Sequence, residues 1–295
     1  MKRFCSVLFF AIFQLSPFIF AQSTSNPAQS GTGAVDTTPN PTVEKKKNQK
    51  SSEKTDFHLE VGAFYSPTVP GPGSLNWRGA DARLIYSGFK RFTPFGGLSR
   101  ISTAQGAQYS YGVGSYITFN KWFYSIAGAS FAPSSQAEFS PHRRYDVAGL
   151  FAVPYVKGMV FSTALTVLPQ YRNAGGGRIL AFGDIYYWRK FIFGGNANLN
   201  FAEPGNRHTV SGQFGATYGT QGKYRVAGGM SGGGAAYMLI TGAPFEVQYQ
   251  TYSAFAMVTK WLTKHSGINC RYDYNRIVGS PFQRHWIRIS TFFDF

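Results

Sequence analysis

Apolar and polar side chains alternate with a period of two residues from Asp56 to the final residue, Phe295. The stretch 191–201, FIFGGNANLNF, shows the pattern clearly, with the phenylalanines, Ala197 and Leu199 on one face and the asparagines on the other. A β-strand points successive side chains to opposite faces, whereas a helix would scatter these residues around its circumference. The alternation therefore predicts strands that each have one apolar and one polar face.

Fourteen such runs can be counted, and short connections alternate with longer ones between them. The runs are 56–65, 76–87, 92–101, 107–119, 121–132, 143–155, 159–170, 178–188, 191–202, 207–219, 223–231, 245–259, 267–276 and 283–295. The pattern predicts an all-β fold over 56–295, a transmembrane antiparallel up-and-down β-barrel of about 14 strands. Twelve or sixteen strands are the alternatives, because 223–231 is rich in glycine and 232–244 could contain another strand.

The composition favours a membrane barrel over a soluble β-sandwich. Aromatic residues make up 17% of the chain and charged residues only 14%, whereas charged residues are about 25% of an average soluble domain. A soluble protein would expose one aromatic-rich face to water, which promotes aggregation. In an outer-membrane barrel that face meets lipid, while the polar face lines the lumen.

Two segments precede the barrel and predict its location. Residues 1–21 have the pattern of a signal peptide, with Lys2 and Arg3 before the apolar run VLFFAIF and a plausible cleavage site after Ala21. Residues 22–55 are rich in Ser, Thr, Pro, Asn and Lys, so they predict a disordered periplasmic linker. We therefore expect Sec export to the Gram-negative outer membrane. An even number of strands places both barrel ends in the periplasm.

The last strand, HWIRISTFFDF, has the features of a membrane-assembly signal. Ile287, Ile289, Phe293 and Phe295 share one face, and an alternating strand that ends in an aromatic residue resembles the signal read by the barrel-assembly machinery. Such a strand offers unpaired backbone groups and an apolar stripe, which suit strand addition to another sheet. We expect this machinery to be a partner during insertion.

The chain resembles the YaiO family of outer-membrane β-barrel proteins across nearly all of 57–295. The similar stretches are LEVGAFYSPTVPGPGSLNWRGADARLIYSG, YGVGSYITFNKWFYSIAGAS, YRVAGGMSGGGAAYMLI and VTKWLTKHSGINCRYDYNRIVGSPFQRHWIRISTFFDF. These stretches contain spaced aromatics, glycines and tryptophans that are architectural rather than catalytic. The resemblance implies a fold and a location, and it transfers no active site.

The parity of each strand predicts which charged and amide side chains face the lumen. They are His58, Glu60, Asp81, Arg83, Arg144, Asp146, Asp184, Arg225, Glu246, Gln248, Gln250, Arg271, Asp273 and Arg288. Because both signs of charge occur, these side chains are expected to pair across the lumen. The alternative is a polar pore with a charged constriction.

Aromatic and basic residues predict the two rims of the barrel. An aromatic girdle at the short turns would contain Trp122, Phe123, Tyr186, Tyr187, Trp188 and Trp261. Basic residues in or beside those turns would meet lipid phosphates: Lys90, Arg91, Lys121, Lys157, Arg189, Lys190, Lys223, Lys260 and Lys264. Arginines at the opposite rim would meet lipopolysaccharide: Arg143, Arg144, Arg172, Arg178, Arg207 and Arg284.

The sequence leaves the molecular role open. The formal net charge is +16, but the secretion signal argues against nucleic acid as a partner. The mature chain retains one cysteine, Cys270, so an intramolecular disulfide or a cysteine metal cluster is excluded. No cofactor, metal or catalytic residue is predicted. A narrow, porin-like pore is the first interpretation, and an accessory barrel in surface-polysaccharide export is the second. A lumen-facing hydrolase is the third interpretation. His58 and Glu60 share the first strand, but no nucleophile is evident beside them. The oligomeric state is open.

Overall fold

The computed structural model describes the barrel and most of its connections. The described residues are 56–69, 76–104, 106–133, 142–169, 176–202, 207–235, 249–279, 281 and 283–295. The expected signal peptide and linker, 1–55, lie outside them. Within the described ranges, no helix has the length and hydropathy needed to span a bilayer.

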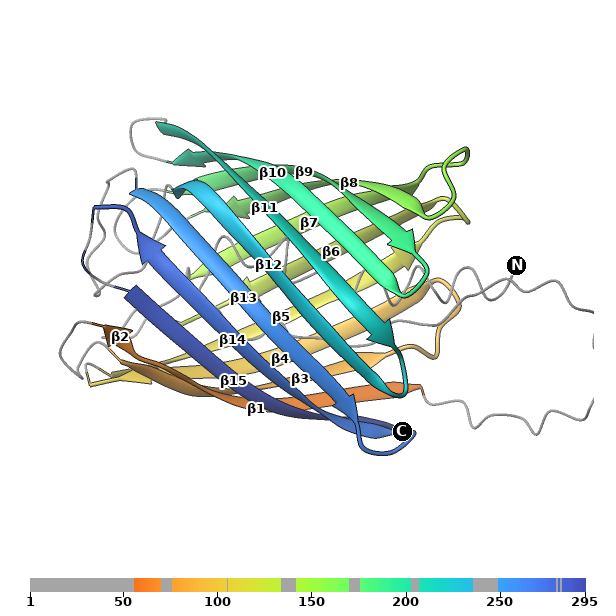
Figure 1. The fold of residues 1–295 in the computed structure, drawn as a ribbon, viewed down its shortest axis with the longest axis horizontal. Helices are drawn as coiled ribbons and strands as arrows, with labels where there is room; N and C mark the ends of the chain where they lie inside the picture. Colours follow the sequence, from red (N-terminus) through yellow and green to blue (C-terminus); the bar gives the residue numbers. More distant parts are fainter. Residues whose placement is uncertain are drawn as a thin grey trace, which may run out of the picture.

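Fourteen long strands form one closed antiparallel barrel, which confirms the predicted fold (Figure 1). They are β1 (Phe57–Ser66), β3 (Trp77–Tyr86), β4 (Phe92–Thr103), β5 (Gly106–Thr118), β6 (Phe123–Phe131), β7 (Arg143–Ala152), β8 (Met159–Leu168), β9 (Gly177–Trp188), β10 (Phe191–Ala202), β11 (Arg207–Thr220), β12 (Tyr224–Ala235), β13 (Tyr249–Trp261), β14 (Ser266–Ile277) and β15 (Gln283–Asp294). Each strand pairs with its neighbour in sequence, and β15 returns to β1. The two-residue strand β2 (Thr68–Val69) extends the edge of β15.

The seam between β1 and β15 joins the two ends of the described chain. Their register runs from His58 opposite Asp294 to Tyr65 opposite Ile287. At the end of the seam, the backbone N–H groups of Asp56 and Phe57 donate to the Phe295 carbonyl oxygen at 3.1 and 2.9 Å. The Phe295 ring stacks on Phe57 with 5.6 Å between ring centroids. The C-terminal residue therefore closes the barrel at the end that carries the short turns (Figure 1).

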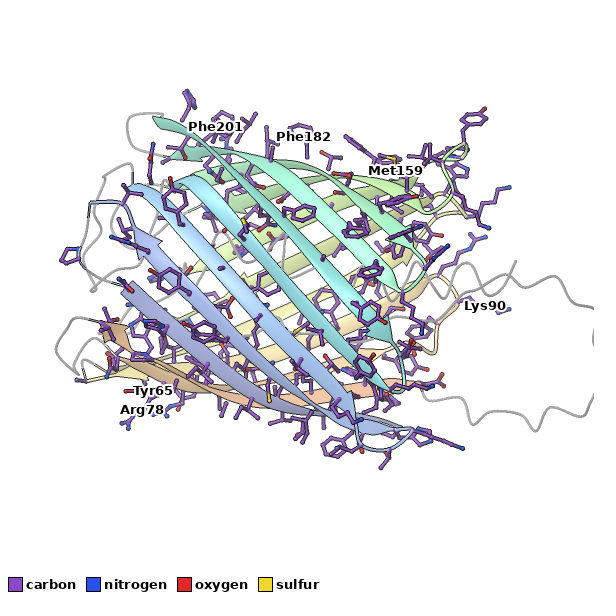
Figure 2. All side chains as sticks on the ribbon, viewed as in Figure 1. Tyr65, Arg78, Lys90, Met159, Phe182 and Phe201 are labelled. Carbon is purple, nitrogen blue, oxygen red and sulfur yellow. The ribbon has the colours of Figure 1, made fainter. Side chains whose placement is uncertain are left out.

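The two faces of the wall have opposite chemistry. Most outward side chains are apolar and exposed, such as Val113 at 66% and Met230 at 68%. Inward polar side chains are buried, such as Thr259 at 0%. Figure 2 shows Phe182 and Phe201 projecting outward from the barrel wall. An apolar exterior band around a polar interior is the arrangement that a lipid bilayer requires.

Inward rings lie over glycines of the neighbouring strand. The pairs are directly opposite in register: Phe64 with Gly79, Phe95 with Gly114, Phe255 with Gly229, and Phe292 with Gly267. A Cβ atom added to Gly114 would lie 2.4 Å from the Phe95 ring and 2.6 Å from the Ala127 carbonyl oxygen. Glycine thus makes room for a flat ring against the wall, a known device for curved sheets.

Replacing one of these glycines should destabilise the barrel. Gly114→Ala should lower the free energy of unfolding by about 1–3 kcal/mol, because the Phe95 ring and a backbone oxygen must move. Gly212→Ala is the matched control, because the nearest atom to its new Cβ is 3.6 Å away, and its effect should stay within about 0.5 kcal/mol. Denaturant unfolding in lipid vesicles measures both. Equal effects of the two variants would contradict this account of the glycines.

Candidate functional site

A buried ion-pair network joins β15, β1 and β3 on the lumen wall. Arg288 donates from Nη1 to Glu60 Oε1 at 2.8 Å and from Nε to Asp81 Oδ1 at 3.0 Å. Ser290 and Asn269 also donate to Glu60, at 2.6 and 3.2 Å. Arg288 and Glu60 are 2% and 1% exposed. Charge-assisted hydrogen bonds of this kind offset the cost of removing the charges from water.

The other lumen ion pairs also run along the wall. Arg144 contacts Asp146 at 2.8 Å and Arg271 contacts Asp273 at 2.6 Å, each two residues along one strand. His58 contacts Asp294 on the adjacent strand at 2.6 Å. Where both partners lie in the described ranges, the expectation of pairing across the lumen is therefore wrong, because these pairs lie along one strand or between neighbouring strands. The reason is geometric, because residues i and i+2 of a strand share a face and an arginine reaches the next carboxylate along it.

The three remaining inward arginines lie over aromatic rings. Arg225 is 5.2 Å from the Trp261 ring centroid, Arg284 is 3.9 Å from Trp77, and Arg83 is 5.0 Å from Phe95. Arg83 also donates to the Tyr116 hydroxyl at 3.1 Å. A ring face attracts a guanidinium through its quadrupole. Each inward arginine in the described strands thus contacts a carboxylate or a ring.

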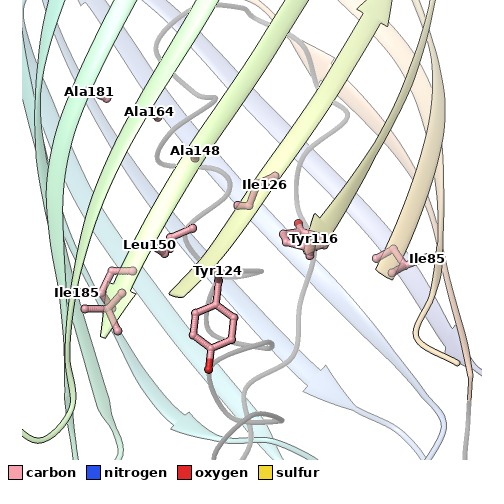
Figure 3. Close-up of a cluster of buried hydrophobic side chains, with 10 residues drawn as sticks. Ile85, Tyr116, Tyr124, Ile126, Ala148, Leu150, Ala164, Ala181 and Ile185 are labelled. Carbon is pink, nitrogen blue, oxygen red and sulfur yellow. The ribbon is translucent and has the colours of Figure 1, made fainter. Parts of the chain in front are cut away.

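An apolar cluster covers the inner wall from β3 to β10 towards the short-turn end (Figure 3). Its buried members are Ile85, Tyr116, Tyr124, Ile126, Ala148, Leu150, Val160, Ala164, Ala181 and Ile185. The cluster begins on β3, the strand that also carries Asp81 of the Arg288 network, and extends from there around about half of the barrel. The simple alternation of the sequence did not predict an apolar inner patch.

Neutral amide and hydroxyl groups line the inner wall from β10 to β13. Asn196 donates to Asn198 at 3.0 Å, and Asn200 donates to Ser211 at 3.2 Å and to the Gly234 carbonyl oxygen at 3.1 Å. These side chains are uncharged, so they offer hydrogen bonds without a strong field. The lumen therefore has three kinds of wall: paired charges, an apolar cluster and a neutral polar ladder.

The structure places most of the expected lumen residues on the inner face. Those are His58, Glu60, Asp81, Arg83, Arg144, Asp146, Arg225, Arg271, Asp273 and Arg288. Glu246 and Gln248 lie outside the described residues, and Gln250 is exposed with an outward register. The four residues of the expected assembly signal, Ile287, Ile289, Phe293 and Phe295, are exposed on the outer face or at its end.

Asp184 was assigned to the lumen wrongly, because it is exposed on the outer face of β9. It lies opposite Phe161 of β8 and Gly195 of β10, and no hydrogen bond or ion pair joins it to another described residue. The sequence carried the signal, because Phe182, Tyr186 and Trp188 have the same parity. The parity was misread for Asp184, which lies between the inward residues Gly183 and Ile185.

Four rim assignments are also corrected. Arg144 and Arg284 point into the lumen and contact Asp146 and Trp77, so they do not face lipid. Trp261 and Tyr187 are inward members of their strands rather than parts of an outer girdle. Trp122 and Trp188 are exposed. Arg172 lies outside the described residues, as does the side chain of Arg207.

The described lumen holds a His–Asp contact but no complete hydrolytic site. His58 Nδ1 bonds to Asp294, while its Nε2 is buried and has no hydrogen-bond partner in the described structure. A nucleophilic mechanism requires a hydroxyl or thiol within reach of that second nitrogen. No cluster of three metal-ligating side chains occurs in the described ranges.

The Arg288 network should be sensitive to removal of its cation. Arg288→Met should lower the free energy of unfolding by about 3–5 kcal/mol, because Glu60 and Asp81 lose the buried charge that compensates them. Adding Glu60→Gln and Asp81→Asn to Arg288→Met should restore most of the loss. Denaturant unfolding in vesicles is the measurement. A triple variant no more stable than the single one would contradict a network held by charge compensation.

Removal of the outward carboxylate of Asp184 should stabilise the barrel, whereas removal of Arg288 should destabilise it. Asp184→Leu should raise the free energy of unfolding in a bilayer by on the order of 1 kcal/mol, because a charge on the lipid face is costly. The matched control is Asp146→Leu, which removes the partner of Arg144 and should destabilise the barrel. Destabilisation by Asp184→Leu would show that the carboxylate has a stabilising partner in the membrane.

Comparisons with known proteins place the fold among outer-membrane barrels. The chain is similar to the Pseudomonas putida toluene transporter TodX, with a TM-score of 0.51 and 8% identity over 80% of this chain and 88% of that one. It is also similar to Omp33 of Acinetobacter baumannii, at a TM-score of 0.47 and 12% identity over 82% and 98% of the two chains. It is also similar to the COG4313 outer-membrane channel of Pseudomonas putida F1, at a TM-score of 0.47 and 9% identity over 85% of this chain and 100% of that one.

No family model matches the chain, and no curated protein matches it. Identities this low show the fold alone. The chain thus has the closed antiparallel β-barrel fold of outer-membrane proteins.

Proposed function

We propose that the protein is an integral outer-membrane channel for small uncharged or amphipathic solutes. The observation that carries the proposal is the electrical balance of the lumen lining. The described strands direct six arginines and five carboxylates inward, which leaves one positive charge when His58 is counted as neutral. Because every one of these arginines contacts a carboxylate or a ring, the wall presents little free charge to a passing ion.

The apolar cluster supports the choice of solute. Leu150 and Tyr124 form part of an inner surface on which an apolar or aromatic group can lie, while the amide ladder offers hydrogen bonds to hydroxyl groups. Binding sites for small molecules commonly combine an apolar surface with a few polar groups. The toluene transporter is named for an aromatic hydrocarbon. That likeness agrees with the proposal, but its support comes from the lining of this barrel.

The proposed orientation follows from the connections. The short turns and the C-terminus share one end, and outer-membrane barrels place short turns in the periplasm. Residues 1–21 would then direct Sec export and 22–55 would form a periplasmic linker. The outward residues Ile287, Ile289, Phe293 and Phe295 would guide insertion by the barrel-assembly machinery. Membership of the YaiO family is part of the same proposal.

Reconstitution tests the channel directly. Vesicles containing the purified protein should take up glucose and phenyl glucoside, and planar bilayers should show weak ion selectivity, with a K⁺/Cl⁻ permeability ratio of about 0.5–2. Leu150→Gln places an amide in the apolar cluster. It should lower uptake of phenyl glucoside relative to glucose by about threefold or more.

Thr251→Gln is the matched control, because it adds the same group to the polar wall outside the cluster. Its uptake ratio should equal that of the unmodified protein. Heat-dependent migration in gel electrophoresis shows whether each variant is folded. A folded protein that admits neither sugar, or that prefers charged solutes, would refute the proposal.

A further inference from the structure

The two rims of the barrel carry different kinds of cation. All lysines in the described part of the chain lie in or beside the short turns: Lys90, Lys121, Lys157, Lys190, Lys223, Lys260 and Lys264. The outward arginines of the described strands lie towards the long-connection end: Arg78, Arg100, Arg143, Arg178 and Arg276. Figure 2 shows Lys90 at one end of the barrel and Arg78, beside Tyr65, at the other.

Two of these arginines are neighbours on the same outer surface. Arg78 of β3 lies opposite Ser102 of β4, and Arg100 lies opposite Ala80, so the arginines occupy diagonal positions on paired strands. Diagonal neighbours across an antiparallel pair are about 7–8 Å apart, within reach of long side chains. Arg143, Arg178 and Arg276 have no arginine at such a position among the described residues.

Nothing in the described protein balances the two charges. Neither guanidinium forms a hydrogen bond or an ion pair with another described residue, although Arg100 lies 5.9 Å from the ring centroid of Tyr109. The described strands direct one carboxylate outward, that of Asp184 on β9, several strands away around the barrel. Two like charges side by side repel each other unless an anion lies between them.

The position and the residue type indicate the anion. Both residues lie near the long-connection ends of their strands, and in the orientation proposed above this is the outer edge of the apolar band, where the lipid headgroups of the outer leaflet begin. Tyr65 and Tyr109 flank it on β1 and β5, opposite Arg78 and Arg100 respectively. Arginine presents a planar fork of donors that binds phosphate oxygens in a bidentate manner, whereas lysine acts as a point charge.

We propose that Arg78 and Arg100 form a clamp for one phosphate group of lipid A, the phosphorylated glycolipid anchor of lipopolysaccharide. Each guanidinium donates to phosphate oxygens from one side, and the Tyr109 ring holds the Arg100 side chain against the wall. The site lies on the outside of the barrel and is separate from the lumen pathway.

The test uses the full chain purified in detergent and titrated with lipid A, with native mass spectrometry as the readout. The unmodified protein should bind lipid A more tightly than enzymatically dephosphorylated lipid A. R78Q/R100Q should weaken lipid A binding by about tenfold or more. R78K/R100K keeps the charge but loses the fork, and it should weaken binding by about threefold.

The matched control is K90Q/R91Q, which removes two exposed cations from a short turn at the other rim. Its affinity should change by less than about twofold. Equal binding by the unmodified protein and folded R78Q/R100Q would overturn the clamp, as would equal binding of lipid A with and without its phosphates. If inorganic phosphate displaced bound lipid A as effectively as added lipid A does, the proposal that the ligand is a lipid would be overturned. If R78Q/R100Q does not fold, the single variants R78Q and R100Q take its place under the same criteria.

Discussion

A chain that crosses a bilayer with strands must pair every backbone N–H and C=O group with another strand, because hydrocarbon offers no hydrogen bonds. This protein meets that constraint by closing fourteen strands into a ring, so that no edge meets lipid. The pairing of β1 with β15 completes the ring, and it brings the first described residues against the last. The wall chemistry follows from closure, because a closed sheet has one face for lipid and one for the lumen.

The fold could be predicted from the sequence because the alternation is a local signal with a single structural reading. In β10, every asparagine points inward, as period two requires. Asp184 obeys the same rule, because it shares the parity of Phe182 and points outward, against the lumen position expected for it. The strand geometry decides the direction of a side chain, even where a charge on the lipid face lowers the stability of the barrel.

The arrangement within the lumen could not be predicted in the same way. Parity placed Arg288, Glu60 and Asp81 on the inner face, but their contact depends on the register between β15, β1 and β3. Register depends on the turns and on how whole strands pair, which a single strand does not encode. The apolar cluster also depends on pairing, since Leu150 and Tyr124 become neighbours only when β6 lies beside β7.

The rings that lie over glycines link positions far apart in sequence. Phe292 and Gly267 belong to different strands, yet each determines what the other can be, since a larger residue at 267 would displace the ring. Loss of the ring would in turn uncover bare backbone. In an evolving lineage, the two sites should therefore be replaced together or kept together, and aligned relatives should show them as a correlated pair.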